Sequence, residues 1–244
     1  DVLVTAFHAL LHRYANQDEI VVGVSTPGSH DPGIRDIVGP VANLVVLRGD
    51  CSGNPSFQTL LTRVARDLSR ARAHQEMPFD RLVLALKPEP DMSRTALFDV
   101  LFHFEAAPPP LRFGAAVGTV LDTNLGFGKN DLHLSLQQVD GQIRGTLVFN
   151  LDIYDHSTAT QMREHFQTLL EQAVLAPERP VGDLSLLSDQ EELRQLETWN
   201  ATDANYPHDK TVHGLFEDQV ARTPDRIALV FAGESLTYRE LDRR

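Results

Sequence analysis

The stretch from Asp131 to Asn150, DLHLSLQQVDGQIRGTLVFN, alternates between apolar and polar residues on either side of a short turn. A period of two is the pattern of a β-strand with one face buried. Asp140-Gly141 is a dipeptide typical of the two-residue turn that joins antiparallel strands, because both positions favour a positive φ. The stretch therefore predicts a β-hairpin within a larger sheet.

Segments with a helical period lie on both sides of this hairpin. At the start of the chain Leu3, Phe7, Leu10 and Tyr14 recur at helical spacing. After the hairpin, residues 155–174, DHSTATQMREHFQTLLEQAV, form an amphipathic pattern. Both segments predict helices that bury one side.

A third helix is predicted in residues 53–75, GNPSFQTLLTRVARDLSRARAHQ. Asn54 is a fitting N-cap, since its side chain can accept a hydrogen bond from the first turn, and Pro55 suits the first helical position. Helices that cover a mixed sheet form an α/β layer arrangement. Further strands are predicted in EIVVGV (19–24), VANLVVLRG (41–49) and ALFDVLFHFE (96–105).

The composition of the 244 residues is that of an ordinary soluble globular protein, with 42% hydrophobic and 23% charged residues. A net charge of -12 argues against a nucleic-acid partner, because such binding depends on clustered cations. The single cysteine, Cys51, excludes an internal disulfide and a cysteine-based structural zinc site. No apolar run approaches the roughly 20 residues that span a bilayer, and there is no signal peptide. We expect a cytoplasmic protein without a membrane partner.

A boundary is predicted near Leu175, where the sequence becomes polar and punctuated by proline. Ser188 and Glu191 in this stretch fit a capping box that starts a short helix. After Pro207 a pattern of helix, strand, turn, strand and helix begins, and it is too short to bury a core by itself. Both ends of the chain cut through elements that need partners, which predicts a fragment of a longer protein.

Few residues point to chemistry when they are taken alone. His8 and His12 have the i, i+4 spacing of zinc ligands on a helix, but no Glu lies between them as in His-Glu-x-x-His. One half-buried and one exposed histidine is the simpler interpretation. Cys51 has no adjacent base, and the sequence contains no Gly-x-Ser-x-Gly, phosphate-loop or dinucleotide motif. These residues support only an α/β binding or transferase-like fragment.

A polar corner interrupts a helical pattern in AHQEMPFDRLVLAL, residues 73–86. Pro78 fixes a backbone angle and ends the preceding helix, while Phe79 can anchor the corner in the core. His74 and Gln75 are then free to form hydrogen bonds. Two interpretations stay open at this point: a rigid structural corner, or a corner whose polar side chains contact a ligand.

The order of several motifs resembles the C-terminal lobe of condensation domains of nonribosomal peptide synthetases. Those domains consist of two chloramphenicol-acetyltransferase-like lobes that flank a tunnel. The resemblance implies such a lobe in residues 1–174, a condensation–adenylation linker in 175–207, and the truncated start of an amino-acid-activating adenylation domain in 208–244. The matching segments are LLHRYANQDEIVVG, VGPVANLVVLR, AHQEMPFDRLV, PDMSRTALFDVLF and NDLHLSLQQVDGQIRGTLVFNLDIYD for the lobe, LLSDQEELRQLETWNATDANYP for the linker, and VHGLFEDQVARTPDRIALVFAGESLTYRELDRR for the last part.

The resemblance also implies site residues. The corner matches a His/Asn-Gln-Asp-x-Pro-Phe-Glu motif, with Glu76 and Asp80 as conservative changes. Asn43 matches the Asn of a Gly-Phe-Phe-Val-Asn-Thr motif, and a Ser-Arg pair matches a loop of the family. The predicted tunnel or motif residues are Asn43, His74, Gln75, Pro78, Phe79, Ser93 and Arg94.

The reaction implied by the resemblance is amide-bond formation between an aminoacyl group and an upstream acyl or peptidyl group. Each is held as a thioester on the phosphopantetheine arm of a peptidyl carrier protein, a partner within the same megasynthetase. The complete adenylation domain would use ATP and magnesium, whereas no cofactor is expected to bind this chain directly. The His-His-x-x-x-Asp-Gly motif of the N-terminal lobe is missing here, because the sequence contains no His-His pair. We therefore expect no catalytic residue in this chain and no activity of the chain alone.

Two other functions of the same fold remain open from the sequence. A condensation-like domain can act as a carrier-protein-binding scaffold without chemistry. An epimerization domain shares the fold, but in the family it is usually followed by another condensation domain, whereas an adenylation start follows here.

Overall fold

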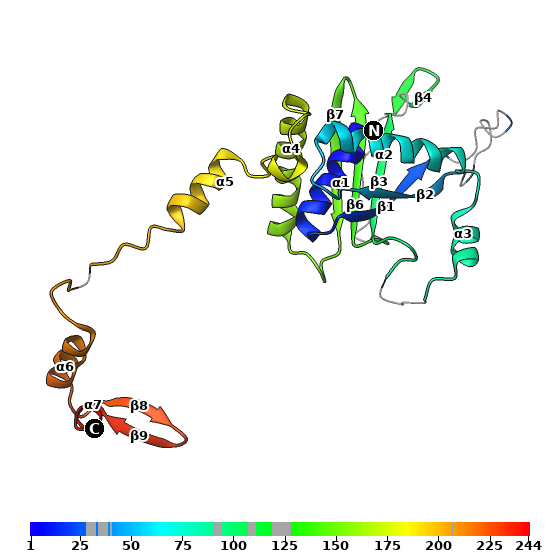
Figure 1. Ribbon diagram of the computed structural model, residues 1–244. Helices are drawn as coiled ribbons and strands as arrows, with labels where there is room; N and C mark the ends of the chain where they lie inside the picture. The colour runs from blue at the N-terminus through cyan, green and yellow to red at the C-terminus, as the bar shows by residue number, and fades with distance from the viewer. Residues whose placement is uncertain are drawn as a thin grey trace. The chain divides into compact units, whose positions relative to one another are not determined.

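A computed structural model describes residues 1–27, 33, 39, 41–89, 94–106, 111–118, 128–205 and 207–244. Their backbone contacts divide the chain into two compact units, Asp1–Glu192 and Leu193–Arg244. Figure 1 shows the helices and strands of both units and labels most of them.

The first unit is built on a five-stranded mixed sheet in the order β2-β1-β3-β6-β7. β1 pairs with β2 in antiparallel register, β3 runs parallel to both β1 and β6, and β6 pairs with β7 in antiparallel register. This confirms the predicted mixed sheet. The strands are β1 (Glu19–Thr26), β2 (Asn43–Asp50), β3 (Val100–Ala106), β6 (Leu132–Val139) and β7 (Gln142–Phe149).

The predicted hairpin is the β6–β7 pair. Val139 pairs with Gln142, so Asp140 and Gly141 alone form the turn. Their φ angles are 50° and 77°, and two successive positive φ angles match the right-handed twist of the flanking strands. Aspartate and glycine tolerate this region better than branched residues do, which explains why the local sequence was sufficient here.

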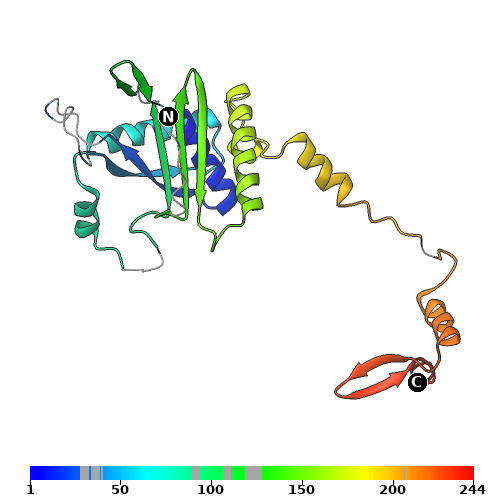
Figure 2. The same cartoon turned by 180° about the vertical axis from the view of Figure 1, so that it is seen from behind.

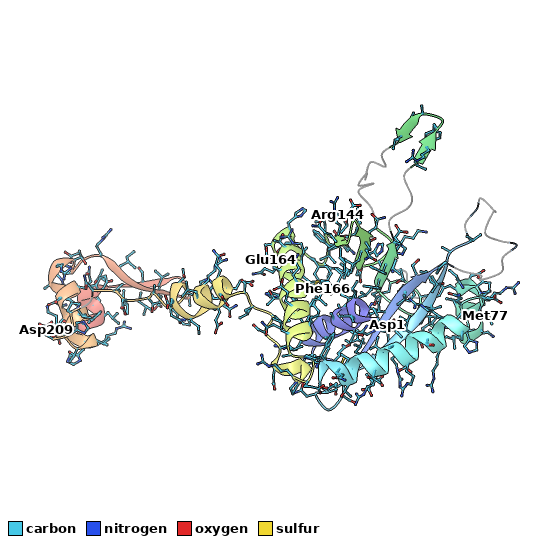
Figure 3. All side chains as sticks on the ribbon, turned by 90° about the horizontal axis from the view of Figure 1, so that it is seen from above. Asp1, Met77, Arg144, Glu164, Phe166 and Asp209 are labelled. Carbon is cyan, nitrogen blue, oxygen red and sulfur yellow. The ribbon has the colours of Figure 1, made fainter. Side chains whose placement is uncertain are left out.

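Three helices cover one face of the sheet: α1 (Val2–Ala15), α2 (Phe57–Ala73) and α4 (His156–Leu175). Their apolar stripes join alternate strand residues, such as Val22 and Leu134, in one core. The ring of Phe7 on α1 lies 6.1 Å from Phe102 on β3 and 6.3 Å from Phe166 on α4. Figure 2 shows α1 and α4 beside the sheet from behind, and Figure 3 marks Phe166 near α1. Shorter elements of this unit are α3 (Phe79–Leu86), β4 (Leu111–Phe113), β5 (Ala116–Gly118), the 3-10 turn η2 (Val181–Asp183) and α5 (Asp189–Leu193).

The predicted N-cap of α2 is wrong. Ser56 is the cap, since its Oγ accepts a hydrogen bond from the Thr59 backbone N–H at 3.2 Å. Asn54 has a φ of 49°, and its Oδ1 accepts a bond from the Gly182 N–H at 2.7 Å. The asparagine is used for a contact with a distant segment, which local sequence does not reveal.

The segment after α4 packs onto the start of α2. The Phe57 and Gln58 backbone N–H groups donate to the carbonyls of Arg179 and Pro177 at 3.1 and 2.9 Å. Val181 and Leu184 follow, and both are buried in the core. Residues 175–192, which were predicted to belong to a linker, therefore lie within the first compact unit. The role of residues 175–207 as a connecting segment stays a prediction.

The second unit contains η3 (Arg194–Thr198), α6 (Val212–Arg222), β8 (Ile227–Phe231), β9 (Glu234–Thr237) and α7 (Tyr238–Asp242). This is the predicted order of helix, strand, turn, strand and helix. Ala232 and Gly233 form the turn with positive φ angles. Apolar side chains stay uncovered, with Val212 86% and Phe231 78% exposed. None of the described residues of this unit, 193–205 and 207–244, is buried, so they form no core of their own.

Candidate functional site

The side chain of Asn43, at the start of β2, holds the corner between α2 and α3. Its Nδ2 donates hydrogen bonds to the backbone carbonyls of Gln75 and Met77 at 2.7 and 2.6 Å. Its Oδ1 accepts a hydrogen bond from the Phe79 N–H at 3.1 Å. One amide side chain thus satisfies three backbone groups of the corner. Met77 marks this corner in Figure 3.

The corner needs a hydrogen-bonding side chain from elsewhere in the chain, because its own N-cap residue supplies no side-chain hydrogen bond to α3. α2 ends at Ala73, and Pro78 occupies the N-cap position of α3 without a side-chain hydrogen bond. The first N–H groups of a helix have no intrahelical acceptor, and a proline cannot cap them. The Phe79 N–H would therefore be unpaired without Asn43. An unpaired backbone group away from water is costly, which gives Asn43 a structural role.

Phe79 attaches the corner to the face of the sheet opposite the three helices. Its ring lies 5.3 Å from the ring of Phe98. Phe98 in turn lies over Gly23 of β1, where an added Cβ would be 2.3 Å from the Phe98 ring. Gly23 alternates with the core residues Val22 and Val24, so it faces away from the helices. The expected anchoring by Phe79 takes the form of an aromatic pair between the half-buried Phe79 and the buried Phe98.

The two polar residues of the corner differ in exposure. Gln75 is buried, at 2% exposure, and its Nε2 has no hydrogen-bond partner within the part of the chain described here. The His74 side chain is exposed, and its backbone N–H bonds to the Ala71 carbonyl at 3.1 Å. Only His74 can therefore present its side chain to a molecule in solution without rearrangement. Gln75 is placed to support the corner from within.

The Ser-Arg pair is only partly described. Ser93 lies outside the described residues. Arg94 approaches Asp99, with Nη1 and Oδ2 3.9 Å apart. Both line a polar cavity of about 210 Å³ together with Lys129 and Asp131. None of the corner residues lines this cavity, so Arg94 belongs to a different polar cluster.

The two N-terminal histidines are separate structural residues. His8 is fully buried, its Nδ1 lies 2.8 Å from the Val4 carbonyl, and burial lowers the pKa of its imidazole. His12 is half-buried, and its Nδ1 lies 2.7 Å from the Gln17 carbonyl. Both are therefore more buried than the sequence predicted. Across the described ranges, no three His, Cys, Asp or Glu side chains gather as metal ligands would.

Cys51 does not have the environment of a nucleophile. Its side chain is fully buried, and burial, followed by the negative charges of Asp50 and Asp18, raises the pKa of the thiol to about 11. The reactive form of cysteine is the thiolate, which is scarce at neutral pH in such an environment. The described residues of this site thus provide shape and hydrogen bonds at the corner, and no activated nucleophile.

A sequence model of the condensation domain matches residues 1–196. The chain belongs to the condensation-domain family. Over the whole chain it is 36% identical to surfactin synthase subunit 1 of Bacillus subtilis (strain 168), of which it spans 7%. It is also 35% identical to malpibaldin synthetase of Mortierella alpina, over 100% of the chain and 4% of that protein. The chain thus spans only a small part of the length of these synthetases.

Solved structures confirm the condensation-domain fold. The X-domain in complex with OxyB from teicoplanin biosynthesis aligns with a TM-score of 0.68 and 27% identity, over 77% of this chain and 42% of that chain. Holo-AB3403, a four-domain nonribosomal peptide synthetase bound to AMP and glycine, aligns with a TM-score of 0.79 and 22% identity, over 98% of this chain and 19% of that chain. Among the residues that the structure describes, no helix is long and apolar enough to cross a membrane.

The local sequence already indicated Pro78 and Phe79 as corner residues, whereas Asn43 was predicted only through the motif resemblance. That the three residues form one unit was not predicted. Phe98 was missed as a partner of the corner. The sequence placed Phe98 inside a strand predicted over residues 96–105, but β3 begins only at Val100. The role of Phe98 depends on Gly23, which lies on another strand 75 residues earlier in the sequence.

Proposed function

We propose that this condensation-domain chain is the C-terminal lobe of a domain that forms amide bonds in a nonribosomal peptide synthetase. Residues 1–174 would form the lobe. The observation that carries the proposal is the corner held by Asn43: the two sequence motifs that resemble the family meet there through three hydrogen bonds. The synthetases among the relatives support the same function.

In the proposed reaction the amine of an aminoacyl thioester attacks the carbonyl of an acyl or peptidyl thioester. A C–N bond forms, the C–S bond breaks, the amine loses a proton, and the donor thiol is released with its phosphopantetheine arm. The arms and their peptidyl carrier proteins belong to the substrates. Catalysis of this kind depends on positioning the two groups and on stabilising the charged tetrahedral species. This chain would supply part of the positioning.

The proposed site residues have different tasks. Asn43, Pro78 and Phe79 would position the corner, Gln75 would support it from inside, and the exposed His74 would be available to contact the substrates. Ser93 and Arg94 remain predicted tunnel or motif residues. The general acid-base chemistry would come from the His-His-x-x-x-Asp-Gly motif of an N-terminal lobe, which this sequence does not contain. The chain alone would therefore be inactive.

We also propose that residues 175–207 connect the lobe to the start of an adenylation domain in residues 208–244. The curated relatives align with this part as well, since the matches cover 100% of the chain. The uncovered apolar side chains of the second unit support a continuation that buries them. ATP and magnesium would be used by the complete adenylation domain.

A non-catalytic scaffold is the second candidate. The similarity to an X-domain, which was solved in complex with OxyB, favours a role in binding a partner protein. An epimerization domain remains a third candidate of the same fold, but the proposed adenylation start after the lobe counts against it.

The test uses the synthetase module that contains this chain, with its carrier proteins loaded with acyl and aminoacyl thioesters. Formation of the amide product, measured by mass spectrometry of the carrier-bound species, supports the proposal. Carrier binding without any product, at full loading, would support the scaffold. Incorporation of solvent deuterium at Cα without amide formation would support an epimerization domain.

A further inference from the structure

Three side chains from three helices form a continuous hydrogen-bonded chain at the end of the first unit. The Oη of Tyr14, in the last turns of α1, lies 2.7 Å from Nδ1 of His165 in the middle of α4. The Nε2 of His165 lies 3.2 Å from Oε1 of Glu191 on α5. The Tyr14 and His165 rings are also in contact, with 5.8 Å between their centroids.

The second oxygen of Glu191 is used as well. The Ser188 backbone N–H and Oγ donate to Glu191 Oε2 at 3.1 and 3.0 Å, and the Glu191 N–H donates to Ser188 Oγ at 3.3 Å. This is the capping box predicted at the start of α5. Glu191 therefore has two separate functions: it caps its own helix with one oxygen and bonds to α4 with the other.

α5 has little else that holds it. None of its residues is buried, whereas Leu184, upstream of the helix, is fully in the core. The His165 and Glu191 side chains are only 13% and 17% exposed, so their contact is largely shielded from water. Ion pairs that are exposed to water contribute little to stability. A pair that is shielded from water is screened less and can contribute more. Leu186 still packs against the core just before α5, and Glu191 is the α5 residue that hydrogen-bonds to α4.

The hydrogen bonds do not require a charged imidazole. In the neutral ring Nε2–H can donate to Glu191 while Nδ1 accepts from the Tyr14 hydroxyl. In the protonated ring both nitrogens donate, and the Tyr14 oxygen accepts. The Tyr14 hydroxyl keeps its proton throughout the neutral range, because burial and then the charge of Glu191 raise its pKa.

We propose that Tyr14, His165 and Glu191 form a clasp that holds the start of α5 on the first unit and thereby fixes the point at which the chain leaves that unit. His165 is the positioning residue of the clasp, since it alone contacts both other members. The compact unit ends at Glu192, one residue after the last clasp residue, so the clasp is the final tether before the second unit begins. This inference concerns only the chain itself and does not depend on the proposed function.

The test measures hydrogen–deuterium exchange of the 244-residue chain, in peptides covering residues 185–193. Asparagine is too short to reach Glu191 from position 165, whereas glutamine can place an amide N–H near the position of Nε2. We therefore expect His165→Asn to raise exchange at residues 188–193 about tenfold, as the loss of one shielded hydrogen bond would. His165→Gln should stay within about threefold of the parent chain. Amides of α1 and β6 report whether each variant is folded.

Glu191→Gln provides a second route, because Glu191 uses both carboxylate oxygens as acceptors and glutamine has only one oxygen, so the capping box and the bond from His165 Nε2–H cannot both keep their acceptor. It should raise exchange at the same residues, and the exposed neighbour changed in Glu192→Gln is the matched control that should not. Unchanged exchange in both His165→Asn and Glu191→Gln would overturn the clasp. An equal rise in His165→Asn and His165→Gln would also overturn it, because that result would point to ring packing instead of the hydrogen bond.

Discussion

The Oδ1 of Asn43 accepts a hydrogen bond from the Phe79 backbone N–H at 3.1 Å, although 36 residues separate them in the sequence. The same side chain donates to the carbonyls of Gln75 and Met77. The strand that begins at Asn43 thus sets the position of the helix that begins at Phe79. The two motifs that carry the resemblance to condensation domains form one structural unit.

Replacing Asn43 should open this corner. Asn43→Ala removes all three hydrogen bonds and leaves a helix N–H and two carbonyls without partners, so we expect a loss of about 2 kcal/mol in the free energy of unfolding. Urea denaturation followed by circular dichroism measures it. Asn43→Asp is the informative comparison. It keeps an acceptor for the Phe79 N–H but places a second oxygen against the carbonyls of Gln75 and Met77. We therefore expect it to be less stable than the parent chain, as Asn43→Ala is. Parent-like stability of Asn43→Ala would show that the corner is held by packing alone.

Gly23 should tolerate no side chain while Phe98 covers it. In Gly23→Ala the added Cβ would be 2.3 Å from the Phe98 ring, so the ring must move, together with its partner Phe79. Overpacking of this kind destabilises a protein by about 1–3 kcal/mol. A double-mutant cycle with Phe98→Leu measures the coupling, because the smaller side chain removes the clash. Additive effects of the two substitutions would contradict this contact.

The N-terminus of α4 should respond to acid through Asp155. Its side chain accepts hydrogen bonds from Ser157 Oγ at 2.6 Å and the Thr158 N–H at 2.8 Å, and these bonds lower the pKa of the carboxyl to about 2. The folded pKa lies below the usual value of 3.8, so the stabilisation is present above about pH 4 and is lost as the pH falls toward 2. Asp155→Asn can still cap the helix but does not titrate there.

Thermal unfolding from about pH 6 to about pH 2 tests this cap. As the pH falls below about 4, the melting temperature of the parent chain should fall more than that of Asp155→Asn. Asp152→Asn serves as the control, since Asp152 is exposed and lies outside the helix. A difference that does not change with pH would show that the carboxyl is not held in its ionised form by the fold.

Cys51 should react only when the first unit opens. The thiol is fully buried with a pKa of about 11, so both access and ionisation oppose reaction in mildly alkaline buffer. We expect labelling by iodoacetamide to be at least about a hundredfold slower in buffer than in concentrated guanidinium, on the basis of the low thiolate fraction and the burial. Mass spectrometry over time measures the rates. Rapid stoichiometric labelling of the native chain would show that this part of the core is open.

Local sequence patterns predicted the helices and strands that depend on residues close together in the chain. Alternation and Asp140-Gly141 were sufficient for the β6–β7 hairpin, because the turn conformation is a property of those two residues. Apolar stripes such as Leu3, Phe7 and Leu10 were sufficient for the helices. The cap of α2 was predicted wrongly, because Asn54 and Ser56 are both good caps and the choice depended on Gly182, far along the chain.

The sequence by itself determined the alternating strands, the amphipathic helices, the hairpin turn and the resemblance to condensation domains, since each depends on neighbours in the chain or on motif order. Only the tertiary structure decided what the motif residues do. Asn43 acts on Gln75, Met77 and Phe79, and His165 acts on Tyr14 and Glu191, across separations that no periodicity spans. A hydrogen bond needs two groups within about 3 Å, and for distant residues the folded sheet and its helices alone provide that proximity.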